Sequence, residues 1–357
     1  MKHRINEIYR KLYKIRRLAI WRDYYYDYVY VKNPFYVNSV HQKGFTLTDW
    51  RLTGLNKRNY STYLSSKEYY RMHPINGSYS HLIDDKLTLK YLLNGTDLDK
   101  YIPEYYFLVD ENGEIYSLMD HPFIPEPSIN DLLLLTKEKG ALAFKPVKST
   151  FGRGFYKVTY TDNELTANGE KISERDFTEI VKNMKNYIVS EYLRPHPYIA
   201  GFWPETSNTI RYLIGRVNRE WLFLKSYIRF GCKTSGATDT FNKGSVLCYI
   251  NENGCFHGGY VKRKKQNRSF TTLIDRHPDT NMVLDGNIPM WDEIEKAARE
   301  VTKLIPQMKY LGFDFVVTDD NKVKLLEINS LTSLDALQLD GSLLKTKNGK
   351  LFFSSVK

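Results

Sequence analysis

Cysteine is scarce in this sequence of 357 residues, which holds 3 of them, Cys232, Cys248 and Cys255. No two stand at C-x-x-C spacing, so neither a disulfide framework nor a paired-cysteine zinc site is expected. No apolar run approaches the roughly 20 residues that span a bilayer, and no internal repeat or low-complexity segment is present. Since the cysteine count is odd and no signal peptide is recognisable, we expect a cytoplasmic protein with reduced thiols.

Charge, in contrast, is abundant and unbalanced. Lysine and arginine number 52 against 41 aspartate and glutamate residues, which gives a net charge of +11. Such an excess favours anionic partners, for example nucleotides, phosphorylated or uronic sugars, nucleic acid or an acidic membrane surface. In residues 2–22, basic residues lie between apolar residues at helical spacing. This segment predicts a basic helix that either docks on its own domain or lies peripherally on an anionic membrane.

The remaining pattern predicts an α+β protein. After a tyrosine-rich stretch at 24–36, turn sequences separate short apolar strands from amphipathic helices. We predict helices at 84–93, 129–139, 175–185 and 291–304. We predict strands at 105–109, 115–118, 141–146, 155–160, 187–193, 209–217, 221–230, 245–250, 310–318 and 322–328.

Residues 145–154, KPVKSTFGRG, connect two of the predicted strands. Closely spaced glycines let backbone N–H groups approach phosphate oxygens, and Lys145 supplies positive charge. The segment is not a Walker A loop, because its lysine precedes the glycines and a strand follows. It predicts either a phosphate-binding loop or a hairpin turn in which Gly152 and Gly154 adopt positive φ.

The C-terminal strand pair carries three oxygen-bearing side chains among apolar neighbours. Asp314 lies on one strand, and Glu327 and Asn329 share a face of the other because they stand two residues apart. Such oxygens suit Mg²⁺, and inward-facing carboxylates need a cation of some kind. Salt bridges to lysine or arginine are the alternative, and the convergence of three oxygen ligands favours the metal. Arg211, near the start of a strand, predicts either a bidentate phosphate contact or a cross-strand ion pair.

The order of these segments resembles that of the ATP-grasp family over residues 80–340. The matching segments are Asp-Lys at 85–86, the strand with Lys145, the glycine loop, VSEYL at 189–193, NTIR at 208–211, GFDF at 312–315 and LEIN at 326–329. RFG at 229–231 and DTFNKG at 239–244 most resemble the sugar-transfer-associated and teichuronic-acid-type groups. The resemblance implies an ATP-grasp fold, in which two α+β lobes sandwich the nucleotide. It divides the chain into an N-terminal basic helix and extension (1–80), an N-terminal lobe (81–190), a C-terminal lobe (191–345) and a tail (346–357).

The resemblance also implies ATP and Mg²⁺ as cofactors, with a role for each matching residue. Nucleotide contacts are implied for Lys86, Lys145, Ser149, Thr150, Gly152, Arg153, Gly154, Glu191, Tyr192 and Leu193, the last three reading adenine. Arg211 and Lys145 are the implied catalytic residues, Asp314, Glu327 and Asn329 the implied metal ligands, and Arg229 and Asn242 the implied acceptor-side residues. Many family members carry an arginine shortly after the Glu-x-Asn motif, whereas Leu331 and Thr332 stand here.

These roles imply an ADP-forming carboxylate–amine ligase that works through an acyl phosphate. By resemblance, its substrates are a uronic acid or related building block of a surface polysaccharide, such as a capsule or cell-wall glycan, and an amine. A kinase that phosphorylates a sugar hydroxyl is one alternative. A basic nucleic-acid-binding protein is the other, and it ranks last because the sequence lacks an RNP-like aromatic strand, a helix-turn-helix and a zinc-finger pattern.

Overall fold

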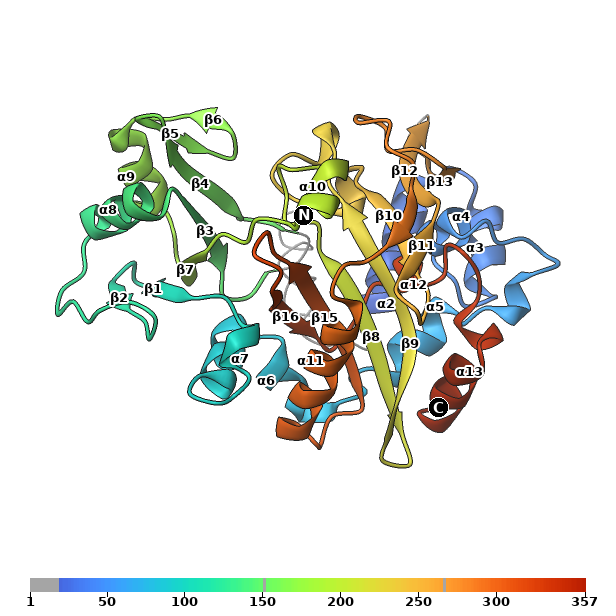
Figure 1. Cartoon of the computed structure of the whole chain (residues 1–357). Helices are drawn as coiled ribbons and strands as arrows, with labels where there is room; N and C mark the ends of the chain where they lie inside the picture. The colour runs from blue at the N-terminus through green and yellow to red at the C-terminus, as the bar shows by residue number, and fades with distance from the viewer. Residues whose placement is uncertain (1–18, 150–151, 266–267) are drawn as a thin grey trace.

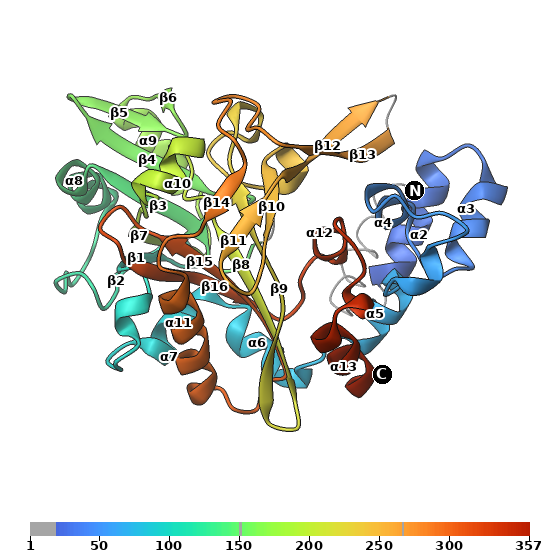
Figure 2. The same cartoon turned by 45° about the vertical axis from the view of Figure 1, so that its right-hand side comes forward.

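The computed structural model describes residues 19–149, 152–265 and 268–357. Two β-sheets lie side by side, each with helices packed on it (Figures 1 and 2). Neighbouring strands in the main path of each sheet run antiparallel. This arrangement confirms the predicted α+β class. Within the described ranges, no helix is long and apolar enough to cross a membrane.

The smaller lobe is built on a sheet that has seven strands within the described residues, in the order β2-β1-β7-β3-β4-β5-β6. The strands are β1 (Tyr105–Val109), β2 (Ile115–Ser117), β3 (Ala141–Pro146), β4 (Tyr156–Thr161), β5 (Glu164–Ala167), β6 (Glu170–Lys171) and β7 (Tyr187–Glu191). Helices α8 (Ile129–Lys139) and α9 (Glu174–Lys182) cover one face, where Leu132 and Phe177 share a hydrophobic core with Phe144 of β3. The predicted helix at 129–139 is confirmed, and the one predicted at 175–185 ends earlier, at Lys182.

The larger lobe is built on a second sheet, whose main path in the described residues is β13-β12-β10-β9-β8-β15-β16. Its strands are β8 (Ile210–Val217), β9 (Glu220–Phe230), β10 (Val246–Ile250), β11 (Cys255–His257), β12 (Gly259–Lys265), β13 (Arg268–Ile274), β14 (Asp285–Asn287), β15 (Tyr310–Val317) and β16 (Val323–Asn329). Helix α11 (Trp291–Leu304) covers one face, where Ile294 packs in one core with Phe313 and Ile228. On the opposite face, Leu337 of α12 (Leu334–Leu337) and Phe352 of α13 (Lys347–Ser355) share a core with Leu213. The strands therefore alternate residues between two buried faces.

Two helices that precede the smaller sheet in sequence pack against the larger one. These are α6 (Ser80–Ile83) and α7 (Lys86–Leu93), and Leu89 and Leu93 belong to the same core as α11. Asp85 caps α7 by accepting a hydrogen bond from the Thr88 backbone N–H at 2.9 Å, so the helix predicted at 84–93 begins at Lys86. The division of the chain into four parts remains a prediction.

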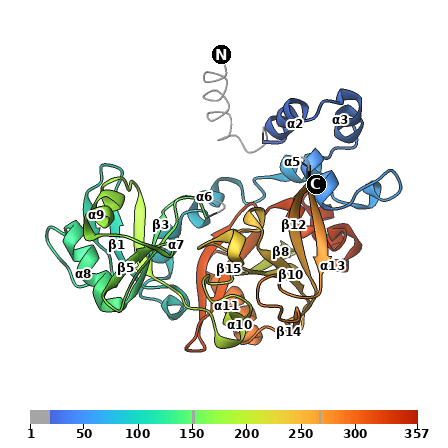
Figure 3. The same ribbon diagram turned by 90° about the horizontal axis from the view of Figure 1, so that it is seen from above.

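The N-terminal helices lie on the side of the molecule away from α8 and α9 (Figure 3). They are α2 (Ala19–Tyr30), α3 (Pro34–His41), α4 (Leu47–Leu52) and α5 (Ser66–Met72). Short 3-10 turns lie at η2 (Tyr60–Thr62), η3 (Gly77–Tyr79), η4 (Asp99–Tyr101), η5 (Lys233–Ser235), η6 (Phe241–Lys243) and η7 (Leu343–Lys345). Most of the basic helix predicted at 2–22 lies outside the described residues, and the tyrosine-rich segment forms α2 and the start of α3. The Thr271 hydroxyl of β13 donates to the Leu52 carbonyl at 2.6 Å and connects α4 to the larger sheet.

Candidate active site

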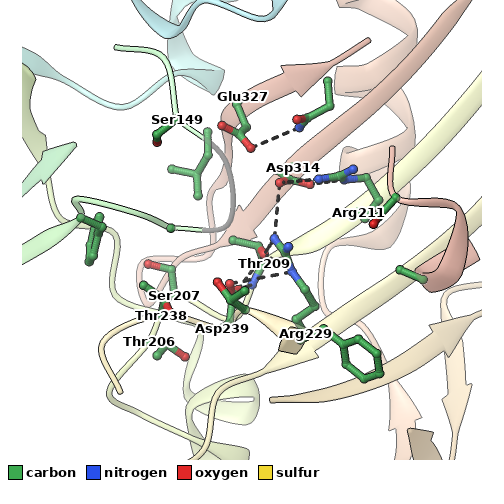
Figure 4. A pocket seen from close by; sticks show the side chains of 18 of the residues that line it. Ser149, Thr206, Ser207, Thr209, Arg211, Arg229, Thr238, Asp239, Asp314 and Glu327 are labelled. Atoms are coloured by element: carbon green, nitrogen blue, oxygen red, sulfur yellow. Dashed lines mark hydrogen bonds and ion pairs between the residues drawn. The ribbon is translucent and has the colours of Figure 1, made fainter. Parts of the chain in front are cut away.

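A cavity of about 370 Å³ lies between the two sheets and is lined by residues of both lobes. Its volume falls within the roughly 300–1,000 Å³ of pockets that bind small molecules. The smaller lobe contributes Ala143, Lys145, Ser149, Gly152, Phe155 and Glu191, and the N-terminal helices contribute Arg22 and Tyr70. The larger lobe contributes most of the remaining wall, part of which is drawn in Figure 4.

Lys145 reaches the cavity because of strand alternation along β3. Ala143 and Lys145 line the cavity, whereas Leu142 and Phe144 belong to the core under the helices. The Lys145 side chain is buried, and its ammonium lies 4.8 Å from the centre of the Tyr105 ring. Burial, followed by the positive charge of nearby Lys86, lowers the pKa of Lys145 to about 7. Lys145 is therefore a buried cation that makes no ion pair within the described residues.

Lys86, the first residue of α7, also lines the cavity and pairs with a residue of the larger sheet. Its ammonium is 2.7 Å from Oε2 of Glu327 on β16. Burial acts to raise the pKa of Glu327, but the charge and hydrogen bond of Lys86 prevail and lower it to about 2. The Glu327 carboxylate is therefore ionised at neutral pH.

A row of paired residues crosses the larger sheet next to Glu327. The strand registers place Glu327 opposite Asp314, Asp314 opposite Arg211, and Arg211 opposite Tyr227. The Arg211 guanidinium donates from Nε to Asp314 Oδ1 and from Nη2 to Oδ2, the latter at 2.9 Å. Burial would lower the pKa of Arg211, but Asp314 raises it above its ordinary value. Arg211 also donates to the Thr332 hydroxyl at 3.2 Å, so the guanidinium is held in one orientation.

A second arginine approaches Asp314 from β9. The Arg229 Nη2 atom lies 3.4 Å from Asp314 Oδ2, and Nε donates to the Thr209 hydroxyl at 3.0 Å. Asp239 accepts hydrogen bonds from the Thr209 backbone N–H and hydroxyl, both at 2.6 Å. Figure 4 shows Arg211 and Arg229 converging on Asp314, and Thr209 with Asp239 beside Arg229. The sequence pattern pointed to Arg229 but not to the roles of Thr209 and Asp239.

The predicted metal ligands meet at the wall of this cavity. Asp314, Glu327 and Asn329 all line it, and the Asn329 amide donates to Glu327 Oε1 at 3.2 Å. The side-chain oxygen of Asn329 accepts no hydrogen bond from the described residues, so it is available to a cation. The two carboxylates pair with Lys86 and Arg211, as the salt-bridge alternative predicts. No group of three or more His, Cys, Asp or Glu side chains suited to a metal lies in the described ranges. The residues fit Mg²⁺ by donor chemistry, and its binding here stays a prediction.

The glycine loop lies only partly within the described residues. Gly152 has φ of 61° and lines the cavity, and a Cβ atom there would lie 2.9 Å from the Thr238 side chain of the larger lobe. Gly154 also has positive φ, at 73°, as the hairpin alternative requires. Gly152 thus lets the loop approach the opposite wall of the cavity.

Most predicted site residues gather at this cavity. Those that line it are Lys86, Lys145, Ser149, Gly152, Glu191, Tyr192, Leu193, Arg211, Arg229, Asn242, Asp314, Glu327 and Asn329. Arg153 and Gly154 are not among its lining residues, and Thr150 lies outside the described residues. Residues 191–193 lie where the chain leaves β7 for the larger lobe, so they contact the cavity from its edge.

Several lining residues were missed at the level of sequence. They include Arg22, Tyr70, Tyr227, Asp239 and Asp335. Asp239 stands in the DTFNKG segment, which is a signal that could have identified it. Arg22 and Tyr70 carry no such signal, because only the packing of the N-terminal helices brings them to the cavity.

The fold and the cavity agree with the comparison to protein families. The model of the family described as sugar-transfer associated ATP-grasp matches residues 65–350, and the chain therefore belongs to this family. The predicted ATP-grasp fold, with two α+β lobes on either side of a cavity, is confirmed. None of the curated proteins matches the sequence significantly.

Solved structures show a distant similarity. D-alanyl-alanine synthetase A of Vibrio cholerae is 14% identical with a TM-score of 0.45, over 79% of this chain and 65% of that one. VanG D-Ala:D-Ser ligase of Enterococcus faecalis is 11% identical with a TM-score of 0.41, over 76% and 61%. The carboxyaminoimidazole ribonucleotide synthase of Aspergillus clavatus, complexed with ATP, is 13% identical with a TM-score of 0.38, over 81% and 56%. The match thus spans less than two thirds of each of these chains.

Proposed function

We propose that this protein is an ATP-dependent carboxylate–amine ligase that forms ADP and works through an acyl phosphate. The observation that carries the proposal is the composition of one cavity, where Lys86, Lys145 and Arg211 surround Asp314 and Glu327. A carboxylate is a poor electrophile, and transfer of the γ-phosphoryl group to its oxygen creates a phosphate leaving group. An amine can then attack the carbonyl carbon.

The charges of the cavity suit this chemistry. In the structure, Glu327 neutralises Lys86 and Asp314 neutralises Arg211. A bound triphosphate would bind to the lysine and arginine side chains in place of the carboxylates. Mg²⁺ would then be held by the carboxylates and the Asn329 side-chain oxygen and would supply positive charge to the phosphate oxygens. The site can therefore exchange internal ion pairs for ligand contacts without exposing an unpaired buried charge.

Each predicted residue then has a place in the proposed mechanism. Lys86 and Lys145 bind phosphate oxygens, and Arg211 stabilises the charge that develops on the transferred group. The loop at 149–154 excludes water, because water would hydrolyse the acyl phosphate. Residues 191–193 hold the adenine, and Arg229 and Asn242 face the acceptor.

We further propose that the carboxylate belongs to a uronic acid or related building block of a surface polysaccharide, such as a capsule or cell-wall glycan. The family description supports a connection with sugar transfer, and the net charge of +11 suits an acidic glycan. A panel of uronic acids and amines, incubated with protein and Mg-ATP and read by mass spectrometry, tests both parts. An amide with ADP and free phosphate supports the ligase, whereas ADP with a stable phosphomonoester would show that the protein is a sugar kinase.

The surface of α2 supports a location at an anionic membrane. Trp21, Tyr25, Tyr28 and Val29 lie on one face of this helix and are 42–61% exposed, and Phe35 of α3 is 86% exposed. Aromatic residues favour the membrane interface, and residues 1–18 carry many lysines and arginines that attract anionic lipid. We propose that this aromatic face contacts the lipid surface.

Vesicle binding tests this location. The protein should sediment with vesicles that contain phosphatidylglycerol, and a Trp21→Ser, Tyr25→Ser, Phe35→Ser variant should bind at least about fivefold more weakly, because aromatic side chains leave the interface. Phe123→Ser is the matched control, since Phe123 is 81% exposed on the smaller lobe. Equal binding of the triple variant and the wild type would contradict the proposal.

A further inference from the structure

Tyr227 lines the cavity with a hydroxyl that the proposed mechanism does not use. Tyr227 is 2% exposed and lines the cavity from β9, two residues before Arg229 and directly opposite Arg211. Its hydroxyl makes no hydrogen bond within the described part of the chain. Burial raises the pKa of Tyr227, so the hydroxyl keeps its proton. The hydroxyl is therefore available to a ligand bound in the cavity.

Asp335 provides a negative charge at the same end of the cavity. It lies in the first turn of α12 and lines the cavity. Its one hydrogen bond within the described residues comes from the Ala336 backbone N–H at 2.8 Å, and it makes no ion pair there. Burial, followed by the charge of Asp335, raises the pKa of neighbouring Asp49 to about 7. Among the described residues, Asp335 therefore brings a carboxylate without an ion pair to this end of the cavity, with Asp49 nearby.

The cations that border this end already have other partners. Arg22 pairs with Asp23 at 2.6 Å, and Lys262 donates to the Asn242 amide oxygen at 2.6 Å. Neither of these contacts involves Asp335. The charge of Asp335 reaches Lys262 and acts to raise its pKa against the effect of burial, but the two described side chains form no ion pair. A cationic ligand can therefore contact the Asp335 carboxylate without breaking either of these contacts.

We propose that Tyr227 and Asp335 bind the second substrate, a primary amine, whose ammonium group faces Asp335 and donates a hydrogen bond to the Tyr227 hydroxyl. This inference rests on the proposed ligase function and names the class of its nucleophile. Adjacent strands lie about 4.8 Å apart, so an amine at Tyr227 lies one strand away from a carboxyl group held by Arg211. The two arginines repel the ammonium and keep it on the Asp335 side of the cavity.

Ligand-observed saturation-transfer NMR on the full-length protein, with a non-hydrolysable ATP analogue and Mg²⁺, tests the assignment. The probes are ethanolamine, alanine and glucosamine, with N-acetylglucosamine as the probe without an ammonium group. At least one of the three amines should bind to the wild type. Its affinity should fall about tenfold or more in Asp335→Asn, and about threefold in Tyr227→Phe, which keeps the packing of the ring.

Two control variants separate this site from general effects on the sheet. Asp340→Asn removes a carboxylate that pairs with Lys225 and does not line the cavity, and Tyr212→Phe removes a hydroxyl that bonds to Glu295 on the other face. Both should bind the amine as the wild type does. Failure of all three amines to bind the wild type, or unchanged binding by Asp335→Asn and Tyr227→Phe, would overturn the assignment.

Displacement of a fluorescent ATP analogue, measured on the same samples, keeps the two proposals apart. If the wild type does not bind the nucleotide, the result counts against the proposed function. Intact nucleotide binding together with absent amine binding counts only against Tyr227 and Asp335.

Discussion

The two lobes carry positive charge into the cavity in different ways. On the smaller lobe, the Lys145 ammonium is buried beside the Tyr105 ring without an ion pair to the described residues. On the larger lobe, Arg211 is bound to Asp314 through two hydrogen bonds. The pKa of Lys145 is accordingly lowered to about 7, whereas that of Arg211 is raised. The comparison indicates that the larger lobe is preorganised before ligand binds, while the smaller lobe presents a lysine that has no partner in an ion pair among the described residues until a ligand binds.

The largest expected effect is on the stability of the larger lobe. Asp314→Asn leaves Arg211 buried without its partner, and breaking such a buried pair costs about 3–5 kcal/mol in the free energy of unfolding. Urea unfolding measures the change. The control Asp319→Asn, in the exposed turn of the same hairpin, should change stability by less than about 0.5 kcal/mol. A loss of similar size in both variants would refute the special status of the Arg211 pair.

The next largest effect should be on turnover, through loss of the proposed Mg²⁺ ligand Glu327. Glu327→Gln should lower the rate of ADP release about 100-fold or more, because it removes a charged oxygen ligand. ADP release is measured as basal ATPase activity and with the substrates found by the screen. Glu205→Gln, which changes a carboxylate that pairs with Lys157, should keep wild-type turnover. Retention of turnover by Glu327→Gln would contradict the metal assignment.

Removal of Lys145 on the smaller lobe should weaken nucleotide binding without lowering the free energy of unfolding. Lys145→Met should weaken binding of Mg-ATP about 10- to 100-fold, since a hydrogen bond to a charged group contributes about 1.5–3 kcal/mol. Its free energy of unfolding should not fall, because the variant removes a buried cation that has no ion pair. Calorimetric titration and urea unfolding measure the two quantities, with Lys137→Met on α8 as the control. Wild-type affinity in Lys145→Met would show that the lysine does not contact the nucleotide.

The smallest effect is a pH dependence that belongs to Lys145. Its pKa is about 7 in the folded protein against an ordinary value of 10.5, so the unfolded chain binds more protons between these values. The cost to stability is fully present below pH 7 and is lost as the pH rises toward 10.5. Between pH 7 and 8, the wild type should therefore gain about 1 kcal/mol relative to Lys145→Met. Parallel stability curves for the two proteins would show that Lys145 titrates normally.

The sequence was informative where the pattern is local. The two-residue spacing of Glu327 and Asn329 placed both on one face, and both line the cavity. The two ends of α8 were also predicted correctly. Such features depend on neighbours within a few residues, which the sequence shows directly.

The missed features depend on contacts between distant segments. Tyr227 reads as one more apolar residue of a strand, and only its register opposite Arg211 brings it to the cavity. Arg22 and Tyr70 reach the cavity through helices whose packing no motif indicates. The ion pair of Glu327 likewise depends on where Lys86 lies.

By itself, the sequence determined which chemical groups each strand presents and on which face they lie, because side-chain alternation is a property of the local backbone. The tertiary structure alone decided which of these groups meet. Strand register and helix packing depend on the burial of the whole core, so a carboxylate acquires its arginine or lysine only when distant segments come together.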